Sequence, residues 1–394
     1  MSAVLLPFEP SEYDLRLHKT RRAMQARGIE LLIVSDPSNM AWLTGYDGWS
    51  FYVHQCVLLA QDGDPVWFGR GQDANGARRT VFMDDADICG YPDHYVQSTE
   101  RHPMDYLTDA VITARGWDGL SIGVEMDNYY FSAACLASLQ RHLPNARFVD
   151  GTGLVNWQRA VKSSREIEYM RRAARIVEAM HARILELVEP GLAKNRLIAE
   201  IYHTGINGAD GFGGDYPAVV PLAPSGPDAS APHLTWDERP FKMNEGTFFE
   251  IAGCYRRYHC PLSRTIYLGT PPQKFIDTEK AVLEGIDAAL DAARPGRTRE
   301  GVEAAWRKVI ARHGIEKESR CGYSIGLSYP PDWGERTMSL RPGDRTVLEE
   351  GMCFHLIPAI WRDDWGLEIT ESFQVTASGA EPFCIYPRRL FVKD

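Results

Sequence analysis

The feature that most constrains the fold is a pattern that occurs twice in the second half of the chain. Residues 244–250, NEGTFFE, line up with residues 349–355, EEGMCFH, 105 positions later. Pro190-Gly191 and Pro295-Gly296 are separated by the same 105 positions, and each pair lies between two stretches with helical periodicity. A repeated unit of helix, Pro-Gly, helix and strand predicts two similar half-domains packed about a pseudo-twofold axis.

Glu250 and His355 occupy equivalent positions in the two copies, so a cleft between the half-domains can receive both. Glu250 lies between Phe249 and Ile251 in a run of β-forming residues. Desolvation of a carboxylate there is costly unless a partner or a substrate compensates. The same predicted hairpin, residues 243–269, also carries a dense polar and aromatic set: Tyr255, Tyr258, His259 and Arg264. We therefore look for the chemistry here, although a duplicated scaffold without an active site fits the repeat as well.

Composition excludes several classes of protein. A net charge of −10 and a pI of about 5.6 argue against a nucleic-acid-binding or anionic-membrane surface. No run of 18 apolar residues could span a membrane, and residues 1–7 lack the basic region of a signal peptide. The eight cysteines form no CxxC pair, which is typical of reduced thiols in a cytosolic protein.

The chain divides near residue 162. Alternating strands and helices before it predict an α/β domain, and Ser163 to Glu166 form a capping box that opens a long helix after it. Helices are predicted at 11–27, about 104–115, 130–142, 164–187, 195–206, 275–293 and 299–313. Strands are predicted at 29–34, 57–60, 66–69, 122–125, 147–149, 247–251, 351–360, 368–375 and 383–386, and a turn at 36–39.

The tract 40–59 is rich in aromatic and histidine side chains, including Trp49 and Tyr52. Such a tract is typical of a core or a dimer interface. It also fits a wall that covers a cationic or planar ligand, because aromatic faces attract cations. Both interpretations hold if the wall reaches into the cleft of a partner subunit. His233 ends a loop rich in Gly, Pro and Ser, and on residue chemistry alone it is more typical of a surface histidine.

Five motifs along the chain point to one family. They are DPSNMAWLTGY at 36–46, SSREIEYMRR at 163–172, SRT at 263–265, GYSIG at 322–326 and ITES at 369–372. With this set the chain resembles the creatinase, prolidase and aminopeptidase P family over nearly its whole length. The resemblance implies a mixed α/β (α+β) fold. An N-terminal creatinase-like α/β domain, residues 1–161, would precede a pseudo-symmetric pita-bread catalytic domain, residues 162–394.

The chain departs from the metal-dependent members of that family. Those members bind metal with two Asp, one His and two Glu, and matching motif by motif places Glu250, Pro261, Tyr323, Ile357 and Glu371 at these positions. Two carboxylates alone cannot hold a dinuclear metal site. The resemblance therefore implies the metal-free branch that contains creatinase, with no cofactor and no metal ligand, and with a loop histidine, here His233, that transfers protons.

Within that branch, residues 47–55 are most similar to the ectoine hydrolases, which open the cyclic amidine of ectoine to N-acetyl-2,4-diaminobutyrate. This resemblance implies ectoine as the small-molecule substrate and hydroxyectoine as a further candidate. It also implies a cytoplasmic homodimer and a deacetylase that acts downstream. The alternatives are a creatinase-like amidinohydrolase, a prolidase-like peptidase and, in another class, a non-catalytic pita-bread binding module.

The resemblance assigns roles around an amidinium ring that is already electrophilic. Glu250 would face the amidine, either as a nucleophile or as the base that activates water. Glu371 would pair with a ring N–H, and His233 would protonate the leaving nitrogen. Arg264 would either neutralise the clustered acids or bind the substrate carboxylate. The remaining substrate-binding residues would be the lining Tyr255, His259, Tyr323 and His355 and the covering Trp49 and Tyr52.

Overall fold

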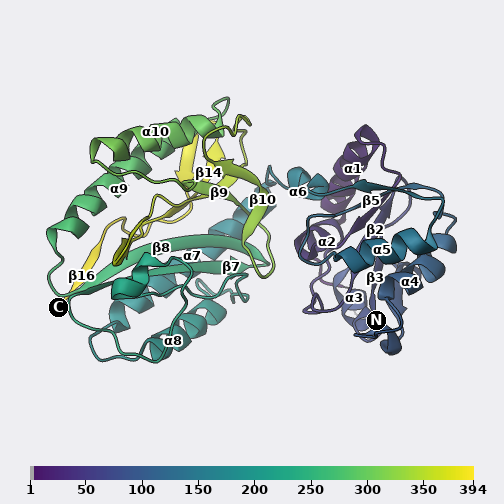
Figure 1. Cartoon of the computed structure of the whole chain (residues 1–394), viewed down its shortest axis with the longest axis horizontal. Coiled ribbons are helices and arrows are strands. Elements are labelled where there is room, and N and C mark those ends of the chain that lie inside the picture. Colours follow the sequence, from purple (N-terminus) through teal and green to yellow (C-terminus); the bar gives the residue numbers. More distant parts are fainter. Residues whose placement is uncertain (1–3) are drawn as a thin grey trace. The chain divides into compact units, whose positions relative to one another are not determined.

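The computed structural model describes residues 4–394 and has two compact units. The first unit ends at Arg159 and the second runs from Ala160 to Asp394, close to the sequence-based division between 161 and 162. Both units combine strands and helices, as the α/β prediction required (Figure 1).

The first unit is a six-stranded mixed sheet with strand order β4-β3-β2-β1-β5-β6. Its strands are β1 (Leu31–Val34), β2 (Cys56–Ala60), β3 (Val66–Arg70), β4 (Ile88–Tyr91), β5 (Ser121–Val124) and β6 (Arg147–Asp150). Because side chains alternate along β1, Leu32 and Val34 enter one hydrophobic core and Leu31 and Ile33 enter another. The sheet is therefore covered on both faces, and its central strand is buried throughout.

Helices supply the two covering layers of this sheet. They are α1 (Pro10–Ala26), α2 (Pro37–Thr44), α3 (Ala74–Thr80), α4 (Pro103–Leu107), α5 (Ala133–His142) and α6 (Leu154–Gln158). The helix predicted at 104–115 is α4 continued by a π-helical stretch, η3 (Thr108–Thr113). The predicted turn at 36–39 is wrong. Asp36 instead caps α2, where its carboxylate accepts the Ser38 N–H at 2.8 Å, and Pro37 occupies the first helical position.

The second unit contains both copies of the repeat. In the first copy, α7 (Ser164–Leu187) and α8 (Lys194–Asn207) precede the strands β7 (Glu245–Tyr255) and β8 (Tyr258–Leu268). In the second, α9 (Gln273–Ala292) and α10 (Arg299–Arg312) precede β9 (Gly322–Ile325), β10 (Gly334–Leu340) and β11 (Cys353–Leu356). Gly191 and Gly296 have φ of 90° and 83°, so the two helix–helix turns use the same left-handed backbone conformation.

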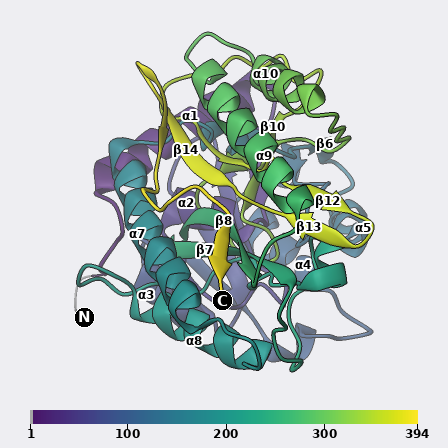
Figure 2. The same ribbon diagram turned by 90° about the vertical axis from the view of Figure 1, so that its left-hand side faces the viewer.

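The strands of this unit form three sheets. One has the order β10-β9-β11-β14-β15, a second has β16-β8-β7, and β12 pairs with β13. The remaining bounds are η4 (Gly226–Ser230), β12 (Ile360–Arg362), β13 (Trp365–Leu367), β14 (Glu371–Thr376), β15 (Gly379–Pro382) and β16 (Phe391–Lys393). Figures 1 and 2 show α7 beside β7 and β8, α8 beside α7, and α9 beside α10.

The β7–β8 hairpin carries Glu250 and packs against α7. Its two-residue turn is Arg256-Arg257, with φ of 51° and 66°, as a type I′ turn requires. The register pairs Glu250 with Ser263, so their side chains lie on one face of the hairpin. α7 packs against both strands, and its N-terminus has the predicted capping box of Ser163 and Glu166.

The strand predicted at 383–386 is wrong. The Arg264 guanidinium donates hydrogen bonds to the carbonyls of Tyr386 and Pro387, at 3.2 and 2.8 Å, so carbonyls at and just beyond the end of this stretch bind a side chain rather than a strand. The β12–β13 hairpin was not predicted, because Asp363 and Asp364 interrupt a run of β-forming residues that is short on both sides. No helix among residues 4–394 is long and apolar enough to cross a membrane.

Candidate active site

Glu250 and His355, the equivalent residues of the repeat, face each other in the second unit. Glu250 projects from β7 and is only 6% exposed, while His355 on β11 is fully buried. Glu250 Oε1 lies 4.0 Å from His355 Nδ1. The pseudo-symmetric arrangement thus brings together the two side chains that the repeat singled out.

His355 belongs to a chain of polar contacts that begins at Trp333. The Trp333 indole N–H donates to the Tyr323 hydroxyl at 2.7 Å, and that hydroxyl lies 3.4 Å from His355 Nδ1. On the other side, His355 Nε2 hydrogen-bonds Thr370 Oγ1 at 2.8 Å. Burial lowers the pKa of His355 to about 3, so its ring is neutral and can relay a proton without holding a charge.

A second carboxylate, Glu368, lies close to Glu250. Glu368 follows β13 and is fully buried, yet neither of its carboxylate oxygens has a hydrogen-bond partner among residues 4–394. Burial raises its pKa to about 7. Ser263 and Trp361 lie close to this carboxylate and partly offset the rise in its pKa. Neither Ser263 Oγ nor Trp361 Nε1 has a hydrogen-bond partner of good geometry within residues 4–394. Four unsatisfied polar atoms in one place are unusual in a folded protein and call for a partner such as a water or a ligand.

The two carboxylates influence each other. Burial raises the pKa of Glu250 well above its usual range, and the charge of Glu368 raises it further. Two neighbouring buried acids cannot both ionise easily, so one holds a proton while the other is a carboxylate. Such a pair can act as a general acid and a general base in the same site.

Lys317 is the cation whose charge acts on both members of this pair. Its Nζ donates to the Ile357 carbonyl at 3.0 Å and lies 4.4 Å from the centre of the Trp361 ring. Its charge lowers the pKa of both glutamates. Burial in turn lowers the pKa of Lys317 to about 8. Lys317 and Trp361 also line a cavity of about 640 Å³, whose other charged lining residues are Arg320, Arg341, Glu316 and Glu318.

The structure does not bring Glu371 to this cluster. Its carboxylate accepts from Arg264 Nη2 at 2.7 Å and from Arg388 Nε at 3.2 Å. Arg264, also fully buried, donates further bonds to the Ser263 and Thr370 carbonyls, at 2.8 and 2.6 Å. Of the two roles predicted for Arg264, this setting matches the neutralisation of a buried acid.

His259 and Tyr255 also form their hydrogen bonds away from the glutamate pair. His259 Nε2 accepts the Ala218 N–H at 2.8 Å, and Nδ1 bonds the Arg257 carbonyl at 2.9 Å. Burial lowers the pKa of His259 to about 3. Tyr255 lies on the opposite face of β7 from Glu250, where its hydroxyl accepts from Arg172 at 2.7 Å.

The three other predicted residues lie on exposed segments. His233 is exposed in a turn after η4 and forms no hydrogen bond or ion pair within the described part of the chain. Trp49 and Tyr52 belong to the first unit and are 58% and 61% exposed. Their predicted roles around the substrate stay predictions.

The residues at the family's metal-ligand positions do not fit a two-metal centre. Pro261 and Ile357 offer no donor side chain, and the carboxylate of Glu371 is held by two arginines. Tyr323 and Glu250 remain, and one phenol and one carboxylate are too few hard donors for two ions.

The sequence motifs had not singled out Glu368 or Lys317. Glu368 lies between Leu367 and Ile369, the same apolar setting that drew attention to Glu250. The signal was thus present, but the ITES motif directed the assignment to Glu371, three residues later. Lys317 follows α10 in an irregular segment of mixed charge and carries no comparable signal.

The fold and the site define a hydrolase of the pita-bread class. The sequence pattern of Metallopeptidase family M24 matches residues 168–377, and that of the Creatinase/Prolidase N-terminal domain matches residues 16–161. The chain belongs to family M24, which confirms the resemblance and the fold that it implied.

Among characterised relatives, the chain is similar to ectoine hydrolase of Halomonas elongata. The two are 59% identical over 399 residues, which cover 100% of both chains. It is also similar to the Xaa-Pro dipeptidase of Lactobacillus helveticus, at 25% identity over 94% of this chain and 96% of that one. The fold matches the crystal structure of a prolidase from Thermococcus sibiricus with a TM-score of 0.83 at 19% identity, covering 96% of this chain and 99% of that one.

Proposed function

We propose that the chain opens the cyclic amidine ring of ectoine by adding water, without a metal ion, to give N-acetyl-2,4-diaminobutyrate. The observation that carries this proposal is the pair of buried glutamates, one of which has no hydrogen-bond partner within residues 4–394. The relative at 59% identity, an ectoine hydrolase, supports the choice of substrate.

A cyclic amidinium complements this site in charge and in hydrogen bonding. Its ring N–H groups are donors, and its delocalised positive charge stabilises the ionised form of neighbouring carboxylates. Glu368 accepts from a ring N–H, the role first predicted for Glu371, because its oxygens are unpartnered and those of Glu371 are not. The substrate carboxylate would lie toward the ammonium group of Lys317, whose charge acts on both glutamates.

Glu250 faces the amidine carbon in this arrangement. Glu250 either removes a proton from the attacking water or attacks the carbon itself, and the C–N bond breaks as the leaving nitrogen gains a proton. In the second route water then hydrolyses the covalent bond between Glu250 and the substrate carbon, which releases the product and restores the carboxylate. His355 and Tyr323 lie beside Glu250 and can relay that proton. His233, Trp49 and Tyr52 keep their proposed roles as proton donor and ring cover, which require contacts made with substrate or with a partner subunit.

The substrate explains why no Lewis acid is needed. An amidinium carbon is already electrophilic, so the site must supply a nucleophile, a proton path and partners for the N–H groups. Creatine also presents a planar cation and a carboxylate, and a creatinase-like reaction is the second candidate on that ground. Hydroxyectoine, which keeps the amidinium ring, is a further substrate candidate.

The test offers ectoine, creatine and an Xaa-Pro dipeptide separately to the purified protein. Ring opening is followed by proton NMR, urea release reports creatine cleavage, and free proline reports peptidase activity. Ectoine turnover that is lost in Glu250→Gln is the expected result. Turnover of creatine or the dipeptide instead would replace the proposal, and ectoine binding without turnover in the unmodified protein would assign a binding module.

A further inference from the structure

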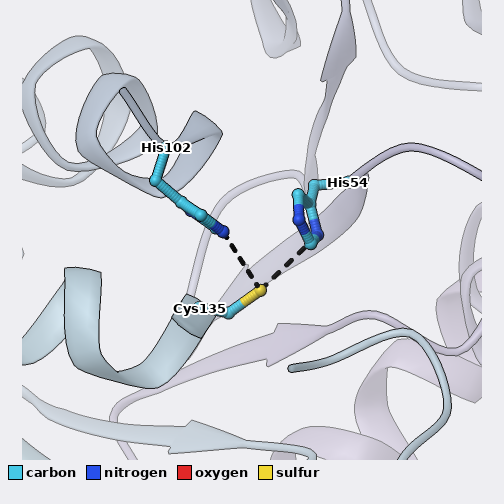
Figure 3. Close-up of side chains that lie close together, drawn as sticks. All are labelled: His54, His102 and Cys135. Carbon is cyan, nitrogen blue, oxygen red and sulfur yellow. Dashed lines mark hydrogen bonds between the residues drawn. The ribbon is translucent and has the colours of Figure 1, made fainter. Parts of the chain in front are cut away.

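Three metal-ligating side chains converge in the first unit, and none of the three has a role in the proposed chemistry (Figure 3). His54 precedes β2, His102 caps the N-terminus of α4, and Cys135 lies in the first turns of α5. Cys135 Sγ is 3.5 Å from His54 Nδ1 and 3.9 Å from His102 Nε2. Within residues 4–394, this is the one group of three or more His, Cys, Asp or Glu side chains spaced to hold a metal ion.

The spacing of the donor atoms matches a zinc site. With Zn–S and Zn–N bonds of about 2.3 and 2.05 Å, a tetrahedral ion separates its sulfur and nitrogen ligands by about 3.6 Å. The two observed S–N separations lie within a few tenths of an ångström of that value. All three donor atoms lie within 4.8 Å of one another, so small side-chain rotations bring them onto one ion.

The donor types suit zinc. His54 and His102 offer ring nitrogens and Cys135 offers a sulfur, from three separate segments of the first unit. The hydroxyl of Ser132 lies 3.3 Å from Cys135 Sγ, where it can donate to a thiolate. Thiolate and imidazole together are the ligands that zinc prefers.

One existing hydrogen bond changes when an ion binds. His102 Nδ1 accepts the Met104 N–H at 3.1 Å, so the ring proton of the unliganded chain is on Nε2. Metal binding through Nε2 moves that proton to Nδ1 and gives up this bond. The other half of the cap remains, because Asp105 accepts the backbone N–H of His102 at 2.8 Å.

A fourth ligand has room on the side of the cluster where His54 lies. A cavity of about 230 Å³ is lined by His54 and Ser132, and its walls include Tyr52 and Pro103. Three protein ligands and an open position next to a cavity are the arrangement in which zinc retains a water or binds a small anion.

We propose that His54, His102 and Cys135 bind one zinc ion in the first unit, with water or a small anion as the fourth ligand. The site is distinct from the glutamate pair, since its residues all belong to the first unit and those of the pair to the second. The proposal does not depend on the substrate of the hydrolase.

The test uses Co²⁺ as the probe and the full-length protein after exhaustive chelation. We expect one Co²⁺ per chain, a thiolate-to-cobalt charge-transfer band, and displacement by one equivalent of Zn²⁺. Cys135→Ser should remove the band, and His54→Gln should weaken binding at least 10-fold. Cys89→Ser, a half-buried cysteine of the same unit outside the cluster, is the matched control and should bind as the unmodified chain does.

Two results would overturn the zinc proposal. One is the absence of the charge-transfer band in the unmodified protein. The other is equal Co²⁺ binding by the unmodified chain and by both the Cys135→Ser and His54→Gln variants. His54 is only partly buried, so its variant keeps the test informative if Cys135→Ser fails to fold. Zn²⁺ should raise the melting temperatures of the unmodified chain and of Cys89→Ser, and should leave those of Cys135→Ser and His54→Gln unchanged.

Discussion

Replacing Glu368 with Gln should stabilise the unliganded protein at alkaline pH while it removes activity. Burial raises the pKa of Glu368 from 4.5 to about 7. At about 1.36 kcal/mol per pKa unit, ionising this side chain in the folded chain costs about 3 kcal/mol. Gln has nearly the shape of the protonated acid and cannot ionise, so the variant does not bear this cost.

The sign of the pH dependence follows from proton binding. Because the folded pKa lies above the unfolded one, the folded state holds the proton more tightly, and the free energy of unfolding falls as pH rises from about 4.5 to 7. The variant should therefore exceed the unmodified protein by under about 1 kcal/mol at pH 5 and by about 3 kcal/mol at pH 8.5. For a unit of this size that gap raises the melting temperature by roughly 6–12 °C.

Scanning calorimetry of both proteins at pH 5 and 8.5 measures the gap, and ectoine turnover measures the loss of function, expected to be at least 10²-fold. Glu371→Gln is the matched control. Its carboxylate is already paired with Arg264, so the same change there should destabilise the chain, by about 3–5 kcal/mol. A Glu368→Gln variant that is no more stable than the unmodified protein at pH 8.5 would refute the reasoning.

Three further predictions concern turnover. Glu250→Ala should abolish ectoine turnover and leave the far-UV circular dichroism unchanged; measurable activity would remove Glu250 from the mechanism. His233→Ala should lower kcat by about 10²-fold or more, whereas an unchanged rate would leave this exposed side chain with no role. Plotted against pH, kcat/KM should rise through about 7 as Glu368 ionises, and Lys317→Met should move that limb to higher pH, because the lysine charge lowers the pKa of both glutamates. A limb that does not move would show that Lys317 does not act on the reacting groups.

The repeat predicted more of the site than the individual motifs did. It placed Glu250 and His355 in equivalent positions, and the structure brings them to 4.0 Å from each other. That inference needed only the symmetry of the second unit, since side chains at equivalent places on two related strands face one axis. The long helices and the β7–β8 hairpin could also be predicted from the sequence, because their periodicity and capping are local properties.

The sequence could not show that Glu371 is paired with an arginine and Glu368 is not. Both Glu368 and Glu371 lie among apolar and β-forming residues, and only the pairing of Glu371 with Arg264 separates them. That pairing joins residues 107 positions apart and depends on tertiary structure. Lys317 was missed for a similar reason, because its contact with Trp361 links two irregular or short segments that no periodic pattern connects.

Stability and function are in conflict at the glutamate pair. A buried carboxylate without a partner destabilises the unliganded chain, and in the proposed function the same group accepts a hydrogen bond from the cationic substrate. The neighbouring Arg264–Glu371 pair shows that the fold can neutralise a buried acid where nothing has to bind. The contrast between two glutamates three residues apart is the reason that we assign the contact with the substrate N–H to Glu368 and not to Glu371.

The most direct test of the central claim is ectoine turnover by protein whose metal content has been measured. The Cys135→Ser variant should be used, so that an ion bound in the first unit does not confuse the count. After exhaustive chelation, with less than about one metal ion per ten chains by mass spectrometry, the account predicts an unchanged kcat, because an amidinium substrate needs no Lewis acid. Loss of turnover on chelation, restored in proportion to added Mn²⁺ or Zn²⁺, would contradict it.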